Sequence, residues 1–274
     1  MIAALGMTMK PDHIRCEKFE ARSRHYLVRM GLFRIMGVPT DISVVEHESA
    51  GRFIPLTQIK TSDELSRFIK DMIPLLYLGA EQAKTIGYIV SELGRNVIEH
   101  AEAENGAVLC AQYYKKSNAI RIGIADTGLG IRATISRSHS APTDLEALRL
   151  ALWPGITGTT RREGGTEQNA GAGLFFIKSI ASVNRDFFVL YSGSGLYKLL
   201  KKPVKRKPRL HADPFEDRHS KESDLPPWRG TAVGIDLTLD QTEAFSTLLD
   251  AIAKTFRDAV RERYRARYKR PRFV

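Results

Sequence analysis

Cysteine is scarce in this sequence, with Cys16 and Cys110 the two present among 274 residues. Two cysteines so far apart are too few for a disulfide framework or a cysteine-ligated zinc site, and they favour a reducing compartment. No apolar run approaches the ~20 residues that a membrane-spanning helix needs. The opening segment 1–5 has no basic flank and is too short for a secretory signal. We therefore expect a cytoplasmic protein without a membrane span.

Two common phosphate-binding motifs are also missing. The sequence has no G-x-x-x-x-G-K-[ST], and neither of its glycine-rich loops completes G-x-G-x-x-G. Hydrophobic residues make up 43% and charged residues 27% of the chain, which is the balance of a globular protein with a sizeable core. The length suits one large domain, or a medium domain with a smaller partner.

Positive charge is in excess, with a formal net charge of +11. It gathers in segment 198–209, which holds no acid, and in segment 257–272, where Asp258 and Glu262 are the acids present. Charge runs of this kind are usually solvated surface, but they also suit nucleic acid, an anionic membrane or an acidic partner. Both interpretations stay open at the level of sequence.

Hydrophobic periodicity predicts an α+β protein in two regions. Residues 1–75 read as a small α/β region of unknown role, and residues 76–274 as the main domain. In the first region we expect a helix over 17–32, strands over 41–45 and 52–56, and a helix that opens at a capping box beginning at Thr61.

The main domain is predicted to be a two-layer α/β sandwich with a mixed, mostly antiparallel sheet. A long connection over 132–170 has the character of a lid, and the stretch 198–229 is a basic insertion that we expect to be a loop. The expected helices cover 81–103, 144–152, 172–183 and a basic C-terminal helix over 241–267, and the expected strands cover 107–113, 119–125, 186–192, 195–200 and 231–239.

Three polar side chains share one face of the helix over 81–103. Glu92, Asn96 and His100 recur every four residues beside an apolar stripe. A carboxylate next to an amide suits magnesium, a hard cation with oxygen ligands, and the carboxylate can also polarise a water or hydroxyl for phosphoryl transfer. Taken alone, the pattern also fits the polar edge of an ordinary amphipathic helix.

Two glycine-rich loops follow. Asp126, Gly128 and Gly130 come directly after a strand, where glycines let backbone approach a flat ligand and the carboxylate can accept a hydrogen bond from an exocyclic amine. Segment 169–174 leads into a helix whose N-terminus can bind phosphates. Each loop taken alone also fits a tight turn or a flexible linker.

The order of these three elements resembles the GHKL ATPase superfamily and its Bergerat fold. That superfamily includes DNA gyrase B, the heat-shock chaperone ATPases, sensor histidine kinases and mismatch-repair ATPases, and the anti-sigma-factor serine kinases share the fold. The resemblance covers roughly residues 80–240, and it is nearest to the histidine kinase and serine kinase branches. It implies an ATP-binding protein that uses Mg²⁺.

The resemblance assigns roles to single residues. Glu92 matches the catalytic acid, Asn96 the magnesium ligand, and His100 the last position of the same motif, the N-box. Asp126 matches the residue that contacts the adenine amine, and Thr231 resembles the threonine that contacts adenine through water. Arg161 and Arg162 in the lid are candidates to reach the γ-phosphate, although solvated arginines are the simpler interpretation. The loop glycines and their neighbour match the remaining cofactor-binding positions, at Gly128, Gly130, Gly171, Gly173 and Leu174.

Some family features are absent. The second glycine loop lacks an extra glycine of the histidine kinases, because Phe175 and Phe176 follow Leu174. No helix with a phosphoacceptor histidine precedes the domain, and no region after residue 240 is large enough for a gyrase-type transducer domain.

Three functions remain open. The first is a signalling protein of the kinase branch that binds or phosphorylates a protein partner. The second is a nucleotide-gated regulator in which ATP orders the lid and exposes a surface for a partner or a homodimer mate, with slow or irrelevant hydrolysis. The third is a DNA-associated ATPase that uses segment 198–209 and the basic C-terminal helix. The sequence does not tell whether ATP is hydrolysed, transferred or only bound.

Overall fold

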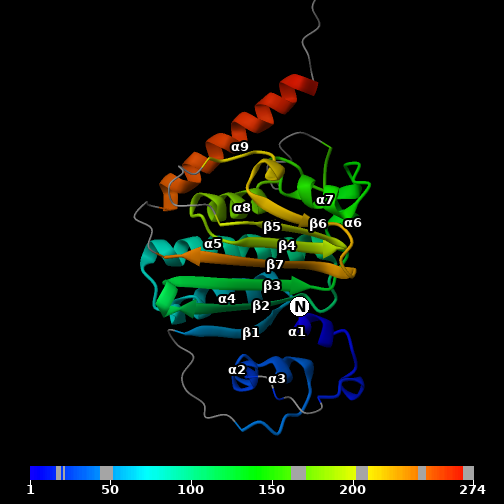
Figure 1. The fold of residues 1–274 in the computed structure, drawn as a ribbon, viewed down its shortest axis with the longest axis vertical. Helices are drawn as coiled ribbons and strands as arrows, with labels where there is room; N and C mark the ends of the chain where they lie inside the picture. The colour runs from blue at the N-terminus through cyan, green and yellow to red at the C-terminus, as the bar shows by residue number, and fades with distance from the viewer. Residues whose placement is uncertain are drawn as a thin grey trace, which may run out of the picture. The chain divides into compact units, whose positions relative to one another are not determined.

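The computed structural model describes residues 1–16, 20, 22–43, 52–161, 171–201, 209–239 and 245–267 (Figure 1). The chain divides into two compact units. The first comprises Met1–Gly130 with Trp228–Asp240, and the second comprises Ile131–Pro227 with Gln241–Val274. The predicted boundary between a region 1–75 and a domain 76–274 stays a prediction.

The first unit contains four antiparallel strands in the order β1-β2-β3-β7. Their bounds are β1 Phe53–Ile59, β2 Ala107–Tyr114, β3 Ala119–Asp126 and β7 Trp228–Thr238. The β2–β3 hairpin turns through the short 3-10 helix Lys115–Ser117, with Asn118 in the left-handed region at a φ of 40°. In this register Asp126 pairs with Ala107, at the end of β3.

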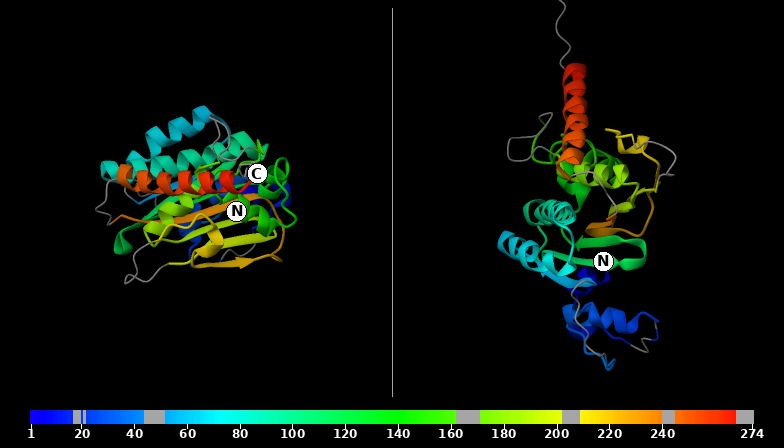
Figure 2. Two further views of the ribbon diagram at one scale, coloured as in Figure 1. Left: turned by 90° about the horizontal axis from the view of Figure 1, so that it is seen from above. Right: turned by 90° about the vertical axis from the view of Figure 1, so that its left-hand side faces the viewer.

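Two helices lie together on one face of this sheet (Figure 2). They are α4, Ser62–Met72, and α5, Ala80–Asn96. The capping box predicted at Thr61 is confirmed, because the Thr61 hydroxyl accepts from the Glu64 N–H and the Glu64 carboxylate accepts from the Thr61 N–H, both at 3.2 Å. Burial drives the docking, since Ile86, Ile89 and Leu109 are at most 1% exposed.

The N-terminal segment differs from the single helix predicted over 17–32. The structure has α1 Ile2–Gly6, α2 Arg24–Arg29 and α3 Leu32–Met36. Gly31, at a φ of 78°, breaks the helix because its backbone is left-handed. Residues 41–43 form no strand, and 17–19, 21 and 44–51 lie outside the described residues. The Leu56 N–H donates to the Met30 carbonyl at 2.8 Å and attaches this segment to β1.

The second unit contains three antiparallel strands and four α-helices within its described residues. The strands are β4 Phe188–Gly193, β5 Gly195–Leu199 and β6 His219–Glu222, paired in that order. The helices are α6 Ile131–Ser136, α7 Asp144–Ala151, α8 Gly173–Val183 and α9 Phe245–Arg267. Its core includes Phe175, Leu148 and Phe188, which are fully buried.

Sequence periodicity missed two of these elements. α6 lies at the start of the predicted lid, and β6 lies in the stretch expected to be a loop. Both are short, so neither offers enough repeats for a periodic signal. Residues 202–208, most of the basic segment 198–209, lie outside the described residues. The predicted α+β class is confirmed, because helices accompany antiparallel sheet throughout the described chain.

Candidate functional site

The helix that carries Glu92, Asn96 and His100 changes its geometry part-way. α5 is α-helical to Asn96, and the next turn, Val97–Ala101, is π-helical. Glu102 then ends it in the left-handed region at a φ of 48°. The sequence predicted an uninterrupted helix over 81–103, and periodicity alone cannot distinguish a single wide turn. π-helical turns are frequent at functional sites in proteins.

Glu92 is partly withdrawn from water, with 25% of its side chain exposed. Burial raises the pKa of its carboxyl group above the usual range, while the Arg95 guanidinium 3.8 Å away acts to lower it and the charge of Glu99 adds to the rise. Arg95 is held mainly by Glu99, at 3.0 Å. A carboxylate with a raised pKa is a better proton acceptor than one in water.

Asn96 has a buried amide nitrogen that finds no hydrogen-bond partner among the described residues. An orphaned buried polar atom is rare and costs about 1–3 kcal/mol, so a ligand that pairs the amide recovers that free energy. Rotation of the amide by 180° exchanges its oxygen and nitrogen, so either a donor or an acceptor can face that ligand. His100 lies one turn further on and has 25% of its side chain exposed.

Asp126 is deeply buried, at 1% exposed. Burial raises the pKa of its carboxyl group to about 6, although N–H groups of Gly128 and Thr231 donate to it and act to lower the pKa. The Gly128 bond is 2.8 Å long. An ionised carboxylate offers about four lone-pair sites, so these two bonds leave acceptor capacity for a ligand.

The loop after Asp126 is fastened to the end of the π-helical turn. The Leu129 N–H donates to the Ala101 carbonyl at 2.7 Å. A Cβ at Gly128 would lie 2.0 Å from that carbonyl oxygen, so only glycine permits this approach. Gly130 has a φ of 78°, a left-handed conformation that glycine adopts readily. The structure therefore brings the first two predicted motifs together.

Gly230 is a residue that the sequence reasoning missed. It has a φ of 102°, and a Cβ there would lie 2.3 Å from the Asp126 carbonyl oxygen and 2.7 Å from the Asp126 Oδ1. This close approach sets the Thr231 N–H against the Asp126 carboxylate. The Trp228 Nε1 also donates to the Asp126 carbonyl, at 3.1 Å. The signal available in the sequence was a glycine directly before Thr231. A glycine is required there because β7 lies beside β3, and the sequence alone does not show that pairing.

The second glycine loop belongs to the second unit. Gly171 has a φ of 62°, and a Cβ there would lie 2.4 Å from the Ile156 carbonyl oxygen. The Gly155 N–H donates to the Gly171 carbonyl at 3.1 Å, so the loop is hydrogen-bonded to backbone of the lid. Gly173 and Leu174 open α8, whose N-cap position carries no side-chain hydrogen bond. The first N–H groups of such a helix can therefore bind an anion.

The described part of the lid is closely hydrogen-bonded. His139 Nε2 lies 3.0 Å from the Thr157 carbonyl oxygen and 3.1 Å from the Thr160 carbonyl oxygen, so this nitrogen carries the proton. The Ser138 hydroxyl donates to the Gly158 carbonyl at 2.8 Å. Arg161 is exposed, and Arg162 lies outside the described residues together with 163–170.

Segment 209–222 of the insertion is anchored to two helices by ion pairs. Lys178 on α8 is fully buried and lies 2.8 Å from Asp217, which is also buried. Arg149 on α7 donates to both carboxylate oxygens of Asp213. Burial would raise the pKa of Asp213, but the Arg149 hydrogen bonds outweigh it and the pKa is lowered. The insertion is therefore tied to α7 and to the helix that follows the second glycine loop.

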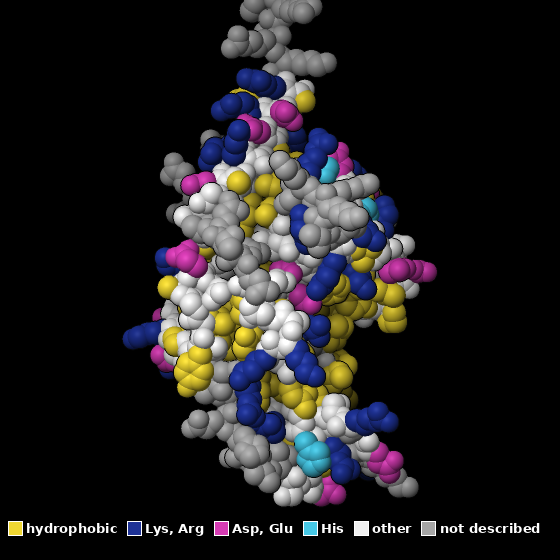
Figure 3. All heavy atoms as spheres, turned by 60° about the vertical axis from the view of Figure 1, so that its left-hand side comes forward, with side chains coloured by type: hydrophobic (Ala, Val, Ile, Leu, Met, Phe, Trp, Pro, Cys, Tyr) yellow, Lys and Arg dark blue, Asp and Glu magenta, His cyan; other side chains and the backbone are white. Residues whose placement is uncertain are grey.

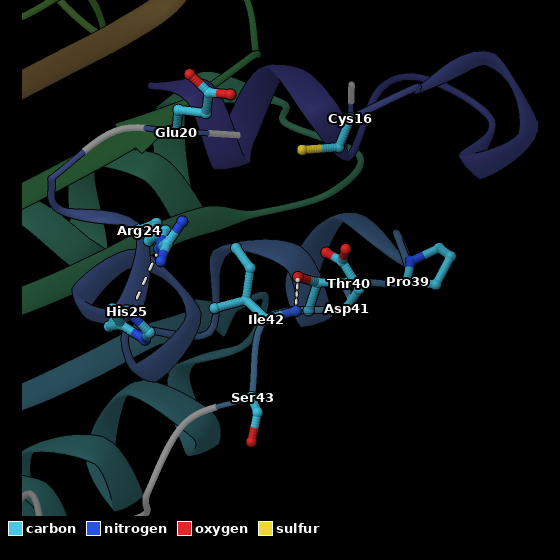
Figure 4. A pocket seen from close by; sticks show the side chains of 9 residues that line it. All are labelled: Cys16, Glu20, Arg24, His25, Pro39, Thr40, Asp41, Ile42 and Ser43. Atoms are coloured by element: carbon cyan, nitrogen blue, oxygen red, sulfur yellow. Dashed lines mark hydrogen bonds between the residues drawn. The ribbon is translucent and has the colours of Figure 1, made fainter. Parts of the chain in front are cut away.

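A pocket of about 870 Å³ lies elsewhere, in the N-terminal segment (Figure 4). Its lining side chains are exposed except for the half-buried Ile42, and none is a predicted site residue. The hydrogen bonds drawn in it join sequence neighbours, from Arg24 to His25 and from the Ile42 N–H to Thr40. We assign it no role in catalysis. The lining comprises Cys16, Glu20, Arg24, His25 and residues 39–43.

The described residues hold neither a cluster of metal ligands nor a membrane-spanning helix. No group of three or more His, Cys, Asp or Glu side chains gathers there in a geometry that holds a metal ion. Magnesium usually keeps several waters and takes few protein ligands, so a site built on one asparagine would not form such a group. Across the same residues, none of the helices combines the length and the apolar character needed to cross a bilayer.

Comparison with known proteins finds a family match for part of the chain. The family model of the histidine kinase-like ATPase domain matches residues 58–184, from within β1 to the end of α8. A search of curated proteins finds no match to the chain. The matched segment contains Glu92, Asp126 and Gly171, so it includes the helix and both glycine loops on which the resemblance depends. Residues 58–184 are therefore similar to the histidine kinase-like ATPase domain, consistent with the GHKL superfamily, and the match supports ATP binding by this part of the chain.

Proposed function

We propose that this protein binds ATP with Mg²⁺ and acts as a signalling kinase or nucleotide-gated regulator on a protein partner. The observation that carries the proposal is the buried carboxylate of Asp126, held by main-chain N–H groups of Gly128 and Thr231. A buried acceptor fixed by backbone, with lone pairs to spare, suits the exocyclic amine of adenine. Thr231 lies beside it to contact the base through water.

Asn96 would bind the magnesium ion, and Glu92 would act on the group that reacts with the γ-phosphate. The buried, unpaired amide of Asn96 fits a cation ligand once its oxygen is turned toward the ion. When bound, magnesium neutralises charge on the β- and γ-phosphates. Glu92, with its raised pKa, would accept a proton from a water or from an acceptor hydroxyl, or would orient that group.

Within the second unit, the second glycine loop would bind phosphate. Gly171 keeps its backbone against Ile156, and the N-terminus of α8 directs N–H groups outward from Gly173 and Leu174. Arg161 is the described lid arginine that would reach the γ-phosphate. The exposure of its side chain supports such a reach.

A titration with a fluorescent ATP analogue tests the nucleotide site. We expect Asp126→Asn to weaken binding about 10- to 100-fold, because a hydrogen bond to a charged group contributes roughly 1.5–3 kcal/mol. Asn96→Ala should abolish the dependence of affinity on magnesium while leaving weak metal-independent binding. Equal ATP affinity and equal magnesium dependence in wild type and both variants would refute the assignment. Circular dichroism would confirm that each variant is folded.

Transfer of a labelled γ-phosphate separates a kinase from a gate. If the protein is a kinase, label appears on an added candidate partner with wild type and disappears with Glu92→Gln, which keeps the size of the side chain. If the protein is a gate, both proteins bind the partner only with ATP present and neither labels it. Partner binding that is indifferent to ATP, with no label on the partner, would contradict both forms of the proposal.

A further inference from the structure

Helix α9, Phe245–Arg267, has an inner face that packs on the second unit. Leu248, Ile252 and Ala259 are at most 9% exposed. The Phe256 ring lies 6.1 Å from the ring of Phe175 and 6.0 Å from that of Phe176, both on α8. This apolar stripe accounts for the attachment of the helix by burial of hydrophobic surface.

Two arginines continue the inner face toward the C-terminus and contact the lid. Arg263 donates to the Pro154 carbonyl, and its guanidinium lies 5.7 Å from the centre of the Trp153 ring. Arg267 donates to the Arg161 carbonyl at 3.3 Å. These two positive charges therefore have a structural use within the protein.

The opposite face carries a different set of cations, which we call the outer basic row: Lys254, Arg257, Arg261 and Arg265. Their spacing of three, four and four residues puts them on one side of the helix, and all four are exposed. Figure 3 shows Lys and Arg side chains gathered along the C-terminal part of this helix. Among the described residues none of the four forms an ion pair, although Asp258 and Glu262 are close in sequence.

Folding alone does not account for this row. Arginines four residues apart on a helix repel each other, and each such pair weakens the helix slightly. The helix dipole favours cations in the last turn, which covers Arg265 but not Lys254 or Arg257. The helix therefore keeps a regular series of like charges, and no carboxylate among the described residues forms an ion pair with them.

We propose that the outer basic row binds the backbone of a single-stranded nucleic acid. With a rise of 1.5 Å per residue, Arg257, Arg261 and Arg265 follow one another about every 6 Å, a regular array that suits a chain of phosphates. Guanidinium groups bind phosphate oxygens in a planar, two-pronged geometry. The sequence continues with Lys269, Arg270 and Arg272.

Tyr264 favours a single-stranded over a double-stranded nucleic acid as the ligand. It is 56% exposed and lies three residues after Arg261, so it borders the outer basic row. An exposed aromatic ring among arginines offers a surface on which an unpaired base can stack, whereas the bases of a duplex are already stacked. This inference concerns α9 and does not rest on the proposed nucleotide site.

Fluorescence anisotropy with a labelled 20-nucleotide oligo-dT tests the row directly. The test variant is Arg257→Gln/Arg261→Gln/Arg265→Gln, and the matched control is Lys70→Gln/Lys115→Gln/Lys116→Gln, which removes the same charge from other exposed positions. Each lost phosphate contact should reduce the salt slope by about 0.7. Three contacts then change the slope by about 2, which corresponds to about 20-fold between 50 and 200 mM salt.

We expect wild type and the control to agree within about twofold and the row variant to lose this salt-dependent affinity. Equal affinity and slope in both triple variants would overturn the proposal. A preference for a duplex of equal length would also overturn it. The proposal would fail as well if the row variant kept its affinity for oligo-dT and lost affinity only for vesicles containing phosphatidylserine or for a poly-glutamate peptide. ATP affinity, measured on the same variants, should stay unchanged. This measurement distinguishes a failure of the outer basic row from a failure of the proposed ATP site.

Tyr264→Ala isolates the stacking contribution. It should weaken oligo-dT binding about 5- to 100-fold with an unchanged salt slope, because stacking involves no ion release. Tyr264→Phe keeps the ring and should retain the affinity. If Tyr264→Ala binds as tightly as wild type, the assignment to single strands fails. Thermal melts provide the folding control, and the row variant should melt no earlier than wild type.

Discussion

Lowering the pH from 7 to 5 should weaken ATP binding through a single group, the buried carboxyl of Asp126. Adenine donates a hydrogen bond, so the carboxylate must be ionised to accept it at full strength. Burial raises the pKa of Asp126 to about 6. About nine-tenths of the sites are therefore ionised at pH 7 and about one-tenth at pH 5, which predicts about a tenfold loss of affinity.

The same pKa has the opposite effect on folding stability. Because the folded protein binds this proton more readily than the unfolded chain, the contribution of Asp126 to stability falls as pH rises from about 4 to about 6. The rise from the ordinary value of 3.8 to about 6 corresponds to roughly 3 kcal/mol. A fall in pH should therefore increase the contribution of Asp126 to the stability of the protein without ATP, while it weakens ATP binding.

Asp126→Asn is the control for both effects, because it cannot titrate. Any pH dependence that remains in the variant, such as that of the nucleotide phosphates, is subtracted from that of wild type. The assay is isothermal titration of ATP between pH 5 and pH 8, with urea unfolding over the same range. If wild type and Asp126→Asn lose affinity in parallel as pH falls, the carboxyl group is not the adenine acceptor.

Two further predictions concern close packing and buried charge. Gly128→Ala should destabilise the protein by about 2 kcal/mol or more and impair ATP binding, because its Cβ would meet the Ala101 carbonyl at 2.0 Å. Gly123→Ala, whose Cβ would have an ordinary 3.8 Å contact, should be nearly neutral in the same urea titration. Lys178→Met should cost about 3–5 kcal/mol by leaving the buried Asp217 carboxylate without its Lys178 counter-ion, whereas Lys178→Met/Asp217→Leu should cost much less. Equal losses in the single and double variants would show that the ion pair is not the cause.

The sequence by itself determined the elements with strong local signals. The capping box at Thr61, the helix through Glu92 and Asn96, and the β2–β3 hairpin all follow from patterns within a few residues of each other. The same holds for the three motifs and their order, and the family match agrees with them. The sequence failed where a signal was short or depended on one residue, as at Gly31, α6 and β6.

Tertiary structure alone decided how the site is assembled within the first unit. The bond from the Leu129 N–H to the Ala101 carbonyl and the approach of Gly230 to Asp126 join residues far apart in the chain. Burial of Asp126, and hence its raised pKa, depends on strands that meet only after folding. Periodicity records which face of an element is apolar, whereas close approach and loss of solvent depend on what packs against that face.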